Sequence, residues 1–475
     1  MRALLLFTLC LLIPRMVVGD SSLPDLGDQT AAISRNDEYR LGRAYERAFR
    51  GSVPTLSDPL VQDYIEHLIY RLAFNTPLPT PDLSIVLIDS TDINAFAVPG
   101  GFVGLNAGVF LYTRSEAELA SVLAHELGHL KQRHYARMMA DSAHDMWWYL
   151  AAMAAAIALG SKGNGDAGMG AIASTQAALA QHQLHYSRQY EQEADRIGLQ
   201  TLVNAHIDPN AMPRFFQRLL DATSGGINIP AYLQDHPVTS SRIADTAARA
   251  AQFHVHYPDD SLEYELIRAS VVAYYTSDVK AALIPLRATI ARGGQDQDSI
   301  LARYTAANLL MNTNHPQEAE PLIRSLIVND PHRIAYVYTL GEILLSEKKY
   351  DAALHLLNDE LADSPTSVPL MLLDAQALTD THQPKAAIAL TQGLLEDRPD
   401  DTDVWQTLAD AYAADNDALD LYRARAELYY LNGDDRHALE QMHLGLQAAG
   451  TNYPARARFE NRLQQMNQGH QDLKN

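Results

Sequence analysis

The sequence contains one cysteine, Cys10, among 475 residues, and it is short of basic side chains. One cysteine cannot form a disulfide within the chain, and zinc or iron–sulfur sites built from several cysteines are excluded. The 58 Asp and Glu outnumber the 37 Lys and Arg, which gives a formal net charge of −21. A chain this acidic repels phosphate backbones, so we expect no nucleic-acid partner.

The chain does have ample apolar mass. Hydrophobic residues make up 47% of it, which is enough for packed cores and excludes a wholly disordered protein. A length of 475 residues predicts two or three domains.

The N-terminus has no apolar run long enough to cross a bilayer, which takes about 20 residues. Arg2 is followed by an apolar run over 3–13 and then by small residues, an order typical of a secretory signal. We predict a cleaved signal peptide over 1–19, with a membrane anchor as the alternative, and a mobile segment over 20–36. Cleavage would remove Cys10, and a cysteine-free protein suits an oxidising compartment.

The C-terminal half repeats every 34 residues. Prolines recur at Pro331, Pro365 and Pro399, and small residues recur at Ala307, Gly341, Ala375 and Ala409 and at Ala319, Ala353 and Ala387. This period is that of the tetratricopeptide repeat, a pair of helices, and small residues suit a close crossing of such a pair. We predict an all-α solenoid over 261–470 whose concave surface binds proteins. From residue 262 onward there are 31 acids and 18 bases, a charge of −13 that would suit a neutral or basic partner surface.

The preceding half mixes helical and strand patterns. The expected elements are a helical stretch over 37–74 and short strands at 83–88, 94–98 and 102–105. Ser115 and Glu118 have the spacing of a capping box, which predicts the start of a long helix there.

An apolar, alanine-rich stretch over 146–159 leads into a glycine-rich stretch that ends at Gly170. The apolar part is too short to span a membrane, so a buried helix and a loop are the favoured interpretation. Long glycine-rich loops are often functional. The alternatives are therefore a mobile lid within 143–182, or an apolar surface that contacts a membrane or an unfolded client.

The segment His125-Glu126-Leu127-Gly128-His129 carries the strongest chemical signal. Positions i and i+4 lie on one face of a helix, so both histidines can direct a nitrogen at one metal ion. Glu126 can then take a proton from water at that ion, which is the arrangement of zinc peptidases. The alternative is a surface helix with two solvated histidines.

A catalytic zinc ion needs a third protein ligand. The segment 186–195 holds Glu191, Glu193 and Asp195, and the first and last of these lie four residues apart on one helix face. One carboxylate could bind zinc while the other orients a ligand histidine. Spacing alone does not decide between Glu191 and Glu193, and an ordinary charged helix face is the alternative.

These two motifs, together with the segment 94–101, resemble the M48 metallopeptidases over roughly residues 35–250. The resemblance implies an α+β zincin-like metallopeptidase domain over 37–258, mostly helical with a small β-sheet, followed by the repeat solenoid. It implies one zinc ion per chain. The site residues that it implies are the ligands His125, His129 and Glu191, the base Glu126 and the supporting carboxylate Asp195.

His236-Pro237 and Arg242 resemble the His-Pro…Arg segment of the same family, which implies that both belong to the catalytic site. From the residues alone, a histidine before a proline is more often a turn residue. His236 would reach the open metal position, as a fourth ligand and switch that blocks water, or would stabilise the oxyanion. Arg242 would hold substrate or a catalytic carboxylate.

Other residues have two interpretations each. The strand residues Asn94, Ala95, Phe96 and Ala97 could bind an extended peptide by strand addition at a sheet edge, or could form an ordinary strand. His134 lies off the metal-binding face, so we expect it beside the ligands or at the surface. His182 and His185 are expected to be solvated.

With a signal peptide and a repeat tail, the whole chain is similar to periplasmic M48 proteases. That similarity implies a role in the assembly and quality control of outer-membrane proteins. It also implies β-barrel clients and contact with the assembly machinery through the repeats. We therefore expect a periplasmic zinc endopeptidase, with peripheral membrane contact left open. The second candidate is a chaperone whose metal site is structural or self-inhibited, and the third is a metal-free scaffold.

Overall fold

The computed structural model describes residues 34–78, 82–141, 188–224, 231–253 and 261–472. The predicted signal peptide, most of the segment 20–36, the predicted lid region 143–182 and both His182 and His185 lie outside these residues. None of the helices in the described part of the chain has the length and apolar character needed to cross a membrane.

The N-terminal half consists of helices around one small sheet. Its elements are α2 (Arg35–Arg50), α3 (Pro59–Phe74), β1 (Ser84–Ile88), β2 (Ala95–Val98), β3 (Phe102–Asn106), α4 (Gly108–Tyr112), α5 (Glu116–Lys131), α6 (His134–Asp141), α9 (Arg188–Asn204), α10 (Ala211–Ser224), α11 (Ala231–Asp235) and α12 (Ser240–Ala250). The stretch predicted as helical over 37–74 is therefore two helices. The second begins where the Asp58 carboxylate accepts the N–H groups of Leu60 and Val61, an N-cap followed by proline at the first helical position.

The first helix begins within the predicted mobile segment 20–36 and takes up its last two residues. The Ser34 hydroxyl accepts the Asp37 N–H, so Arg35 and Asn36 are helical. The capping box at α5 is also different in detail. Ser115 accepts the Glu118 N–H as expected, but the Glu118 carboxylate accepts the N–H of the preceding residue rather than that of Ser115.

The sheet has the order β1-β3-β2, with β1 parallel and β2 antiparallel to β3. β2 is therefore an edge strand, as strand addition would require. It begins at Ala95, so Asn94 precedes it. The β2–β3 turn uses Gly100 and Gly101 with φ of +83° and +84°, where a side chain would be strained. α5 packs against β2, which brings the metal-binding motif to this edge.

The C-terminal half is helical throughout its described residues. Its elements are α13 (Leu262–Tyr275), α14 (Val279–Arg292), α15 (Gln297–Asn312), α16 (Pro316–Ile327), α17 (Ile334–Ser346), α18 (Tyr350–Asp363), α19 (Val368–Asp380), α20 (Pro384–Asp397), α21 (Thr402–Asp415), α22 (Ala418–Leu431), α23 (Asp435–Ala449) and α24 (Tyr453–Asp472). The recurring Ala319, Ala353 and Ala387 are fully buried. At Gly341 an added Cβ would lie 2.7 Å from Leu373 Cδ2. The repeat prediction is confirmed: small residues are kept where helices approach closely.

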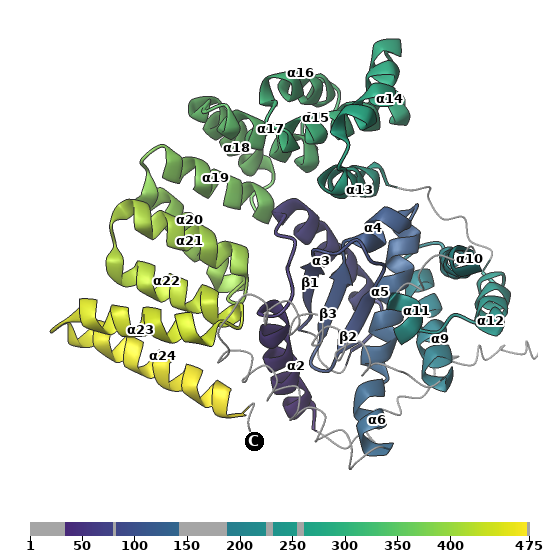
Figure 1. The fold of residues 1–475 in the computed structure, drawn as a ribbon, viewed down its shortest axis with the longest axis horizontal. Helices are drawn as coiled ribbons and strands as arrows, with labels where there is room; N and C mark the ends of the chain where they lie inside the picture. Colours follow the sequence, from purple (N-terminus) through teal and green to yellow (C-terminus); the bar gives the residue numbers. More distant parts are fainter. Residues whose placement is uncertain (1–33, 79–81, 142–187, 225–230, 254–260, 473–475) are drawn as a thin grey trace, which may run out of the picture.

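The repeat array curves around the peptidase half (Figure 1). It packs on α2, α3 and α4, and polar contacts hold both of its ends. Near its start, Arg268 Nε donates to the carbonyls of Phe110 and Thr113, at 3.0 Å each. Near its end, Arg47 of α2 donates to the Tyr430 carbonyl at 2.8 Å. The array is therefore fixed to the side of the sheet where α2 and α3 lie.

The contact between α2 and the α22–α23 turn leaves no room for a side chain. Gly433 has a φ of +69°, and an added Cβ would lie 2.2 Å from the Arg47 carbonyl oxygen. Gly450 has a φ of +52°, but nothing lies within 4 Å of its added Cβ. Both glycines share the conformation, and only Gly433 has the close neighbour.

We expect Gly433→Ala to lower the free energy of unfolding by about 1–3 kcal/mol more than Gly450→Ala. Both alanines carry the left-handed strain of about 1–2 kcal/mol, but only the first also forces α2 and the repeat array apart. Urea unfolding of the two variants measures the difference. Equal losses would show that this contact does not hold the array.

Candidate metal centre

Helix α5, which carries the predicted metal-binding motif, crosses α9 at small residues. At Gly128 an added Cβ would lie 2.8 Å from the Ala194 carbonyl oxygen, and at Gly198 it would lie 3.2 Å from the His125 backbone nitrogen. These glycines let the two helix backbones approach closely. As a result, one face of α5, with His125 and His129, lies against the face of α9 that carries Glu191.

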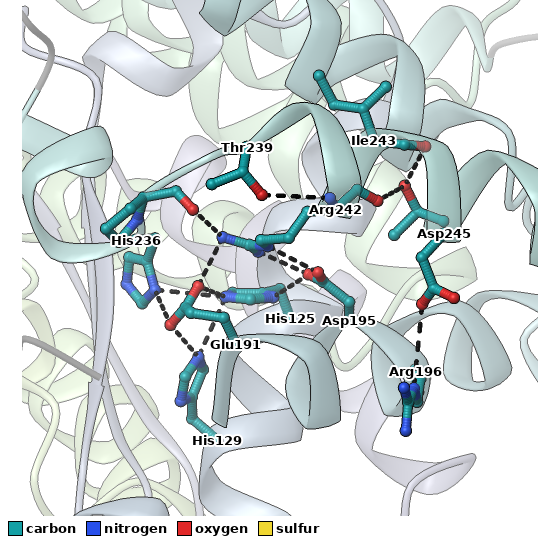
Figure 2. A network of polar contacts seen from close by, with 12 residues as sticks. His125, His129, Glu191, Asp195, Arg196, His236, Thr239, Arg242, Ile243 and Asp245 are labelled. Atoms are coloured by element: carbon teal, nitrogen blue, oxygen red, sulfur yellow. Dashed lines mark hydrogen bonds and ion pairs between the residues drawn. The ribbon is translucent and has the colours of Figure 1, made fainter. Parts of the chain in front are cut away.

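Four buried side chains from α5, α9 and the residue after α11 direct ligand atoms at one point: His125, His129, Glu191 and His236. Their ligand atoms all lie within 4.8 Å of one another. The Nε2 atoms of the two α5 histidines are 3.1 Å apart. Each of these nitrogens lies 3.4 Å from a Glu191 carboxylate oxygen (Figure 2).

His236 completes the group. Its Nδ1 lies 3.3 Å from His125 Nε2 and 3.2 Å from Glu191 Oε1. Zinc bonds of 2.0–2.1 Å in a tetrahedron place neighbouring ligand atoms about 3.3 Å apart. With Glu191 Oε1 as the carboxylate donor, four separations between donor atoms, from 3.1 to 3.4 Å, match edges of such a tetrahedron, and all the donor atoms lie within 4.8 Å of one another. The side chains therefore fit a zinc ion, and the four donors would fill its coordination positions.

The charges in this region also suit a cation. Glu126, Glu191, Asp195 and Asp235 are buried, and each is at most 1% exposed. Among the described residues near them, Arg242 is the buried guanidinium that faces two of these carboxylates. Burying charge without compensation is costly, and a divalent ion among the ligand atoms would offset the excess of carboxylates.

The structure distinguishes the two glutamates that spacing left open. Glu191 lies in the cluster, whereas the Glu193 carboxylate contacts His134 and Arg137, at 3.1 and 2.7 Å. These contacts, led by the one with His134, lower the pKa of Glu193 to about 2. Glu193 therefore lies outside the four-donor cluster, as a charged carboxylate that His134 and Arg137 hold in place.

Asp195 and Arg242 fix two of the ligands from behind. Asp195 Oδ1 lies 3.0 Å from His125 Nδ1, the ring nitrogen that points away from the cluster. Arg242 contacts both Asp195 oxygens at 2.7 Å and Glu191 Oε2 at 2.7 Å. Of the two roles expected for Arg242, the contacts are those of the residue that holds a carboxylate.

His236 is placed by a backbone connection to the sheet side of the site. The Tyr232 N–H donates to the Ile93 carbonyl at 3.0 Å, and the His236 N–H donates to the Tyr232 carbonyl at 2.7 Å. The Asn94 amide donates to the Asp235 carboxylate at 3.4 Å. The first residue of the predicted substrate strand therefore supports the segment that carries His236.

Glu126 lies between His236 and the edge strand. Its Oε1 is 3.6 Å from His236 Nε2. Burial raises the pKa of Glu126 to about 8, and the His236 ring and the Ala97 backbone N–H partly offset that effect. A carboxyl group with a raised pKa next to a metal site is suited to accepting and returning a proton.

Sequence reasoning missed several contributors to this site. Phe216 lies under the Arg242 guanidinium, 4.8 Å from it, and the Tyr232 ring packs on His236 with centroids 4.9 Å apart. Neither aromatic residue stands in a motif, so no local pattern could have found it. His134 was expected beside the ligands or at the surface, and it contacts the His129 ring.

Comparison with known proteins identifies the N-terminal half. The model of peptidase family M48 matches residues 59–250, and a tetratricopeptide repeat model matches residues 344–411. The β-barrel assembly-enhancing protease of Escherichia coli (strain K12) is 32% identical over 96% of this chain and 93% of its own length. This chain belongs to peptidase family M48. The M48 peptidases are zinc-dependent metallopeptidases, so the predicted enzyme class, cofactor and fold class are confirmed.

Other relatives match over nearly the whole chain or over about a third of it. The putative β-barrel assembly-enhancing protease of Vibrio cholerae is 32% identical over 94% of this chain and 92% of its own. The mitochondrial metalloendopeptidase OMA1 of Arabidopsis thaliana is 29% identical over 33% of this chain and 30% of its own. The first relatives thus match along both halves of this chain, and OMA1 matches over about a third of it.

We expect Glu126→Gln to stabilise the metal-free protein, and the gain to grow as pH rises from 5 to 8. The folded protein keeps the Glu126 proton up to its raised pKa of about 8, whereas the unfolded chain loses it near the ordinary glutamate pKa of 4.5. Between these values the wild type loses up to about 1.4 kcal/mol per pH unit relative to the glutamine variant. Melting temperatures of both chelator-treated proteins across this range measure the effect, and a difference that does not vary with pH would contradict it.

Proposed function

We propose that this M48 peptidase is a periplasmic zinc endopeptidase that acts on outer-membrane β-barrel proteins during their assembly and quality control. The observation that carries the proposal is the position of Glu126, between a four-donor cluster and a buried edge strand. The names of the full-length relatives support the client class. A cysteine-poor chain supports the oxidising compartment.

His125, His129 and Glu191 are the proposed zinc ligands. A zinc ion there would polarise the scissile carbonyl and make water more acidic. Glu126 then accepts the proton of the attacking water and passes it to the leaving amine. Asp195 keeps His125 in the tautomer that presents Nε2 to the metal, and Arg242 keeps Asp195 and Glu191 in place.

The edge strand is the proposed substrate-binding element. β2 is the strand at one end of the described sheet and pairs with β3, and we propose that an extended peptide binds along its outer edge by strand addition. Strand addition would align the peptide backbone with the Ala97 N–H, which lies beside Glu126. β-barrel clients that have not completed their sheets offer unpaired strands, which matches this mode of binding.

The repeat array is the proposed surface for the assembly machinery and for clients. A solenoid of helix pairs presents an extended surface suited to protein partners. Its concave side is partly covered by α2 and α3, so the surface left for partners is narrower than that of a solenoid alone. The charge of −13 from residue 262 onward favours basic or neutral partner surfaces.

We expect Glu126→Gln to abolish proteolysis of an unfolded β-barrel client while the protein still binds one zinc ion per chain. The substitution removes the base and leaves the proposed ligands in place, and loss of a general base costs about 10²–10⁴-fold in rate. Client cleavage on gels and metal content by elemental analysis are measured on the same samples. Retained cleavage would contradict the role of Glu126.

The second candidate function is that of a chaperone with a closed metal site, and the position of His236 favours it. Four donors around one ion leave no open position for water. A chaperone would rescue barrel assembly in cells with the Glu126→Gln variant, whereas a protease would not. Rescue by that variant would therefore make client binding, rather than cleavage, the main activity.

We also propose that His236 is a switch that holds the peptidase inactive until its segment moves. We expect His236→Ala to raise client cleavage several-fold, because it opens the fourth position and leaves the other three donors. Initial rates of cleavage at saturating zinc measure this. Cleavage that is unchanged or lower would contradict self-inhibition and would favour a role of His236 in stabilising the oxyanion.

A further inference from the structure

The His129 ring has a second nitrogen, and it contacts another histidine rather than a carboxylate. His129 Nδ1 lies 2.9 Å from His134 Nδ1. The other nitrogen of that ring, Nε2, lies 3.1 Å from Glu193 Oε2, and the Arg137 guanidinium contacts the same oxygen at 2.7 Å. The two histidine side chains are 2% exposed or less. The chain of contacts thus runs from the metal-binding cluster to an anchored carboxylate.

We propose that His134 and Glu193 form a relay that orients His129 and fixes its tautomer for metal binding. The proposal rests on the zinc centre proposed above. When His129 binds the metal through Nε2, its proton is on Nδ1 and is donated to His134 Nδ1. His134 then carries its own proton on Nε2 and donates it to Glu193. With this one set of tautomers, each ring nitrogen of the two histidines binds the metal, donates a hydrogen bond or accepts one.

The other α5 histidine has the same support in a shorter form. His125 Nδ1 lies 3.0 Å from Asp195, and Arg242 holds that carboxylate at both oxygens. Each ligand histidine is therefore connected to a carboxylate that an arginine holds in place. His125 contacts its carboxylate directly, and His129 is connected to its carboxylate through His134. In this scheme Glu193 does for one ligand what Asp195 does for the other.

The local backbone and an aromatic ring hold the relay rigid. Arg133 has a φ of +49°, which turns the chain after α5 and returns His134 to the side of His129. The Tyr190 ring stacks on the His134 ring with centroids 4.6 Å apart and planes 13° apart. The Arg137 guanidinium lies 4.6 Å from the centroid of the same tyrosine ring. Tyr190 and Glu193 both belong to α9, so the α5–α9 crossing positions the relay as well as the ligands.

If His134 only filled space, its replacement would change different properties from those that a relay predicts. Removal of a hydrogen-bond partner behind a ligand typically lowers metal affinity 10–100-fold. Loss of packing alone lowers stability without a matching change in metal affinity. Metal affinity and the ligand field of the bound ion are therefore the readouts that separate the two.

The test compares four variants of the full chain with the wild type. His134→Phe keeps a ring that can stack on Tyr190 and removes both nitrogens, and His134→Gln restores an oxygen that can accept the His129 proton. Glu193→Gln weakens the far end of the relay. Gln200→Ala is the matched control, because Gln200 is exposed on the same helix and its amide contacts Asn204 rather than a member of the relay.

Zinc affinity is measured by competition with a chromophoric chelator, and the coordination is followed by the visible spectrum of the cobalt-substituted protein. We expect zinc affinity to fall 10–100-fold in His134→Phe with an altered cobalt spectrum, and by less in His134→Gln and Glu193→Gln. The Gln200→Ala control should match the wild type. Melting temperatures of the metal-free proteins report any loss of folding separately.

Zinc affinity within twofold of the wild type in both His134→Phe and Glu193→Gln would overturn the relay. If His134→Phe does not fold, zinc affinity within twofold of the wild type in Glu193→Gln overturns it equally. A wild-type protein that binds zinc while these variants also do so unchanged leaves the proposed function intact. A wild-type protein that binds no zinc overturns the metal centre itself, and the relay with it.

Discussion

The close crossing of α5 and α9 is the constraint on which the rest of the structure depends. Gly128 and Gly198 are the points of nearest approach, where a Cβ would meet the opposite backbone. The crossing brings the carboxylates of α9 to the two histidines of α5. It explains why a glycine lies between the ligand histidines and why an alanine follows the second glutamate, since larger side chains would separate the helices.

The crossing also concentrates buried charge, which the fold must compensate. Arg242 holds Asp195 and Glu191, and Arg137 holds Glu193. Among the residues that the structure describes, His236 is the partner of Glu126 at ion-pair distance, and burial raises the pKa of Glu126. The arginines therefore stabilise the charged form of the supporting carboxylates, whereas the proposed base keeps a raised pKa that favours proton exchange. Perturbed pKa values of this kind are common among reacting groups.

Much of this could be predicted from the sequence, where periodicity or a motif carries the information. The 34-residue spacing of small residues predicted the repeat array, and the two histidines four residues apart predicted the metal site. Spacing could not separate Glu191 from Glu193, because a helix face is broader than two residues and the choice depends on how α9 rotates against α5. The packing of Phe216 and Tyr232, and of α2 on the end of the array, follows from long-range contacts that no local pattern encodes.

The central claim is that one zinc ion lies where α5, α9 and the His236 segment meet. A crystal structure of the zinc-loaded protein, with anomalous data at the zinc edge, tests it most directly. The account predicts one peak per chain, about 2.0–2.2 Å from His125 Nε2, His129 Nε2 and a Glu191 oxygen. A peak elsewhere, or one bound by Glu193 in place of Glu191, would contradict it.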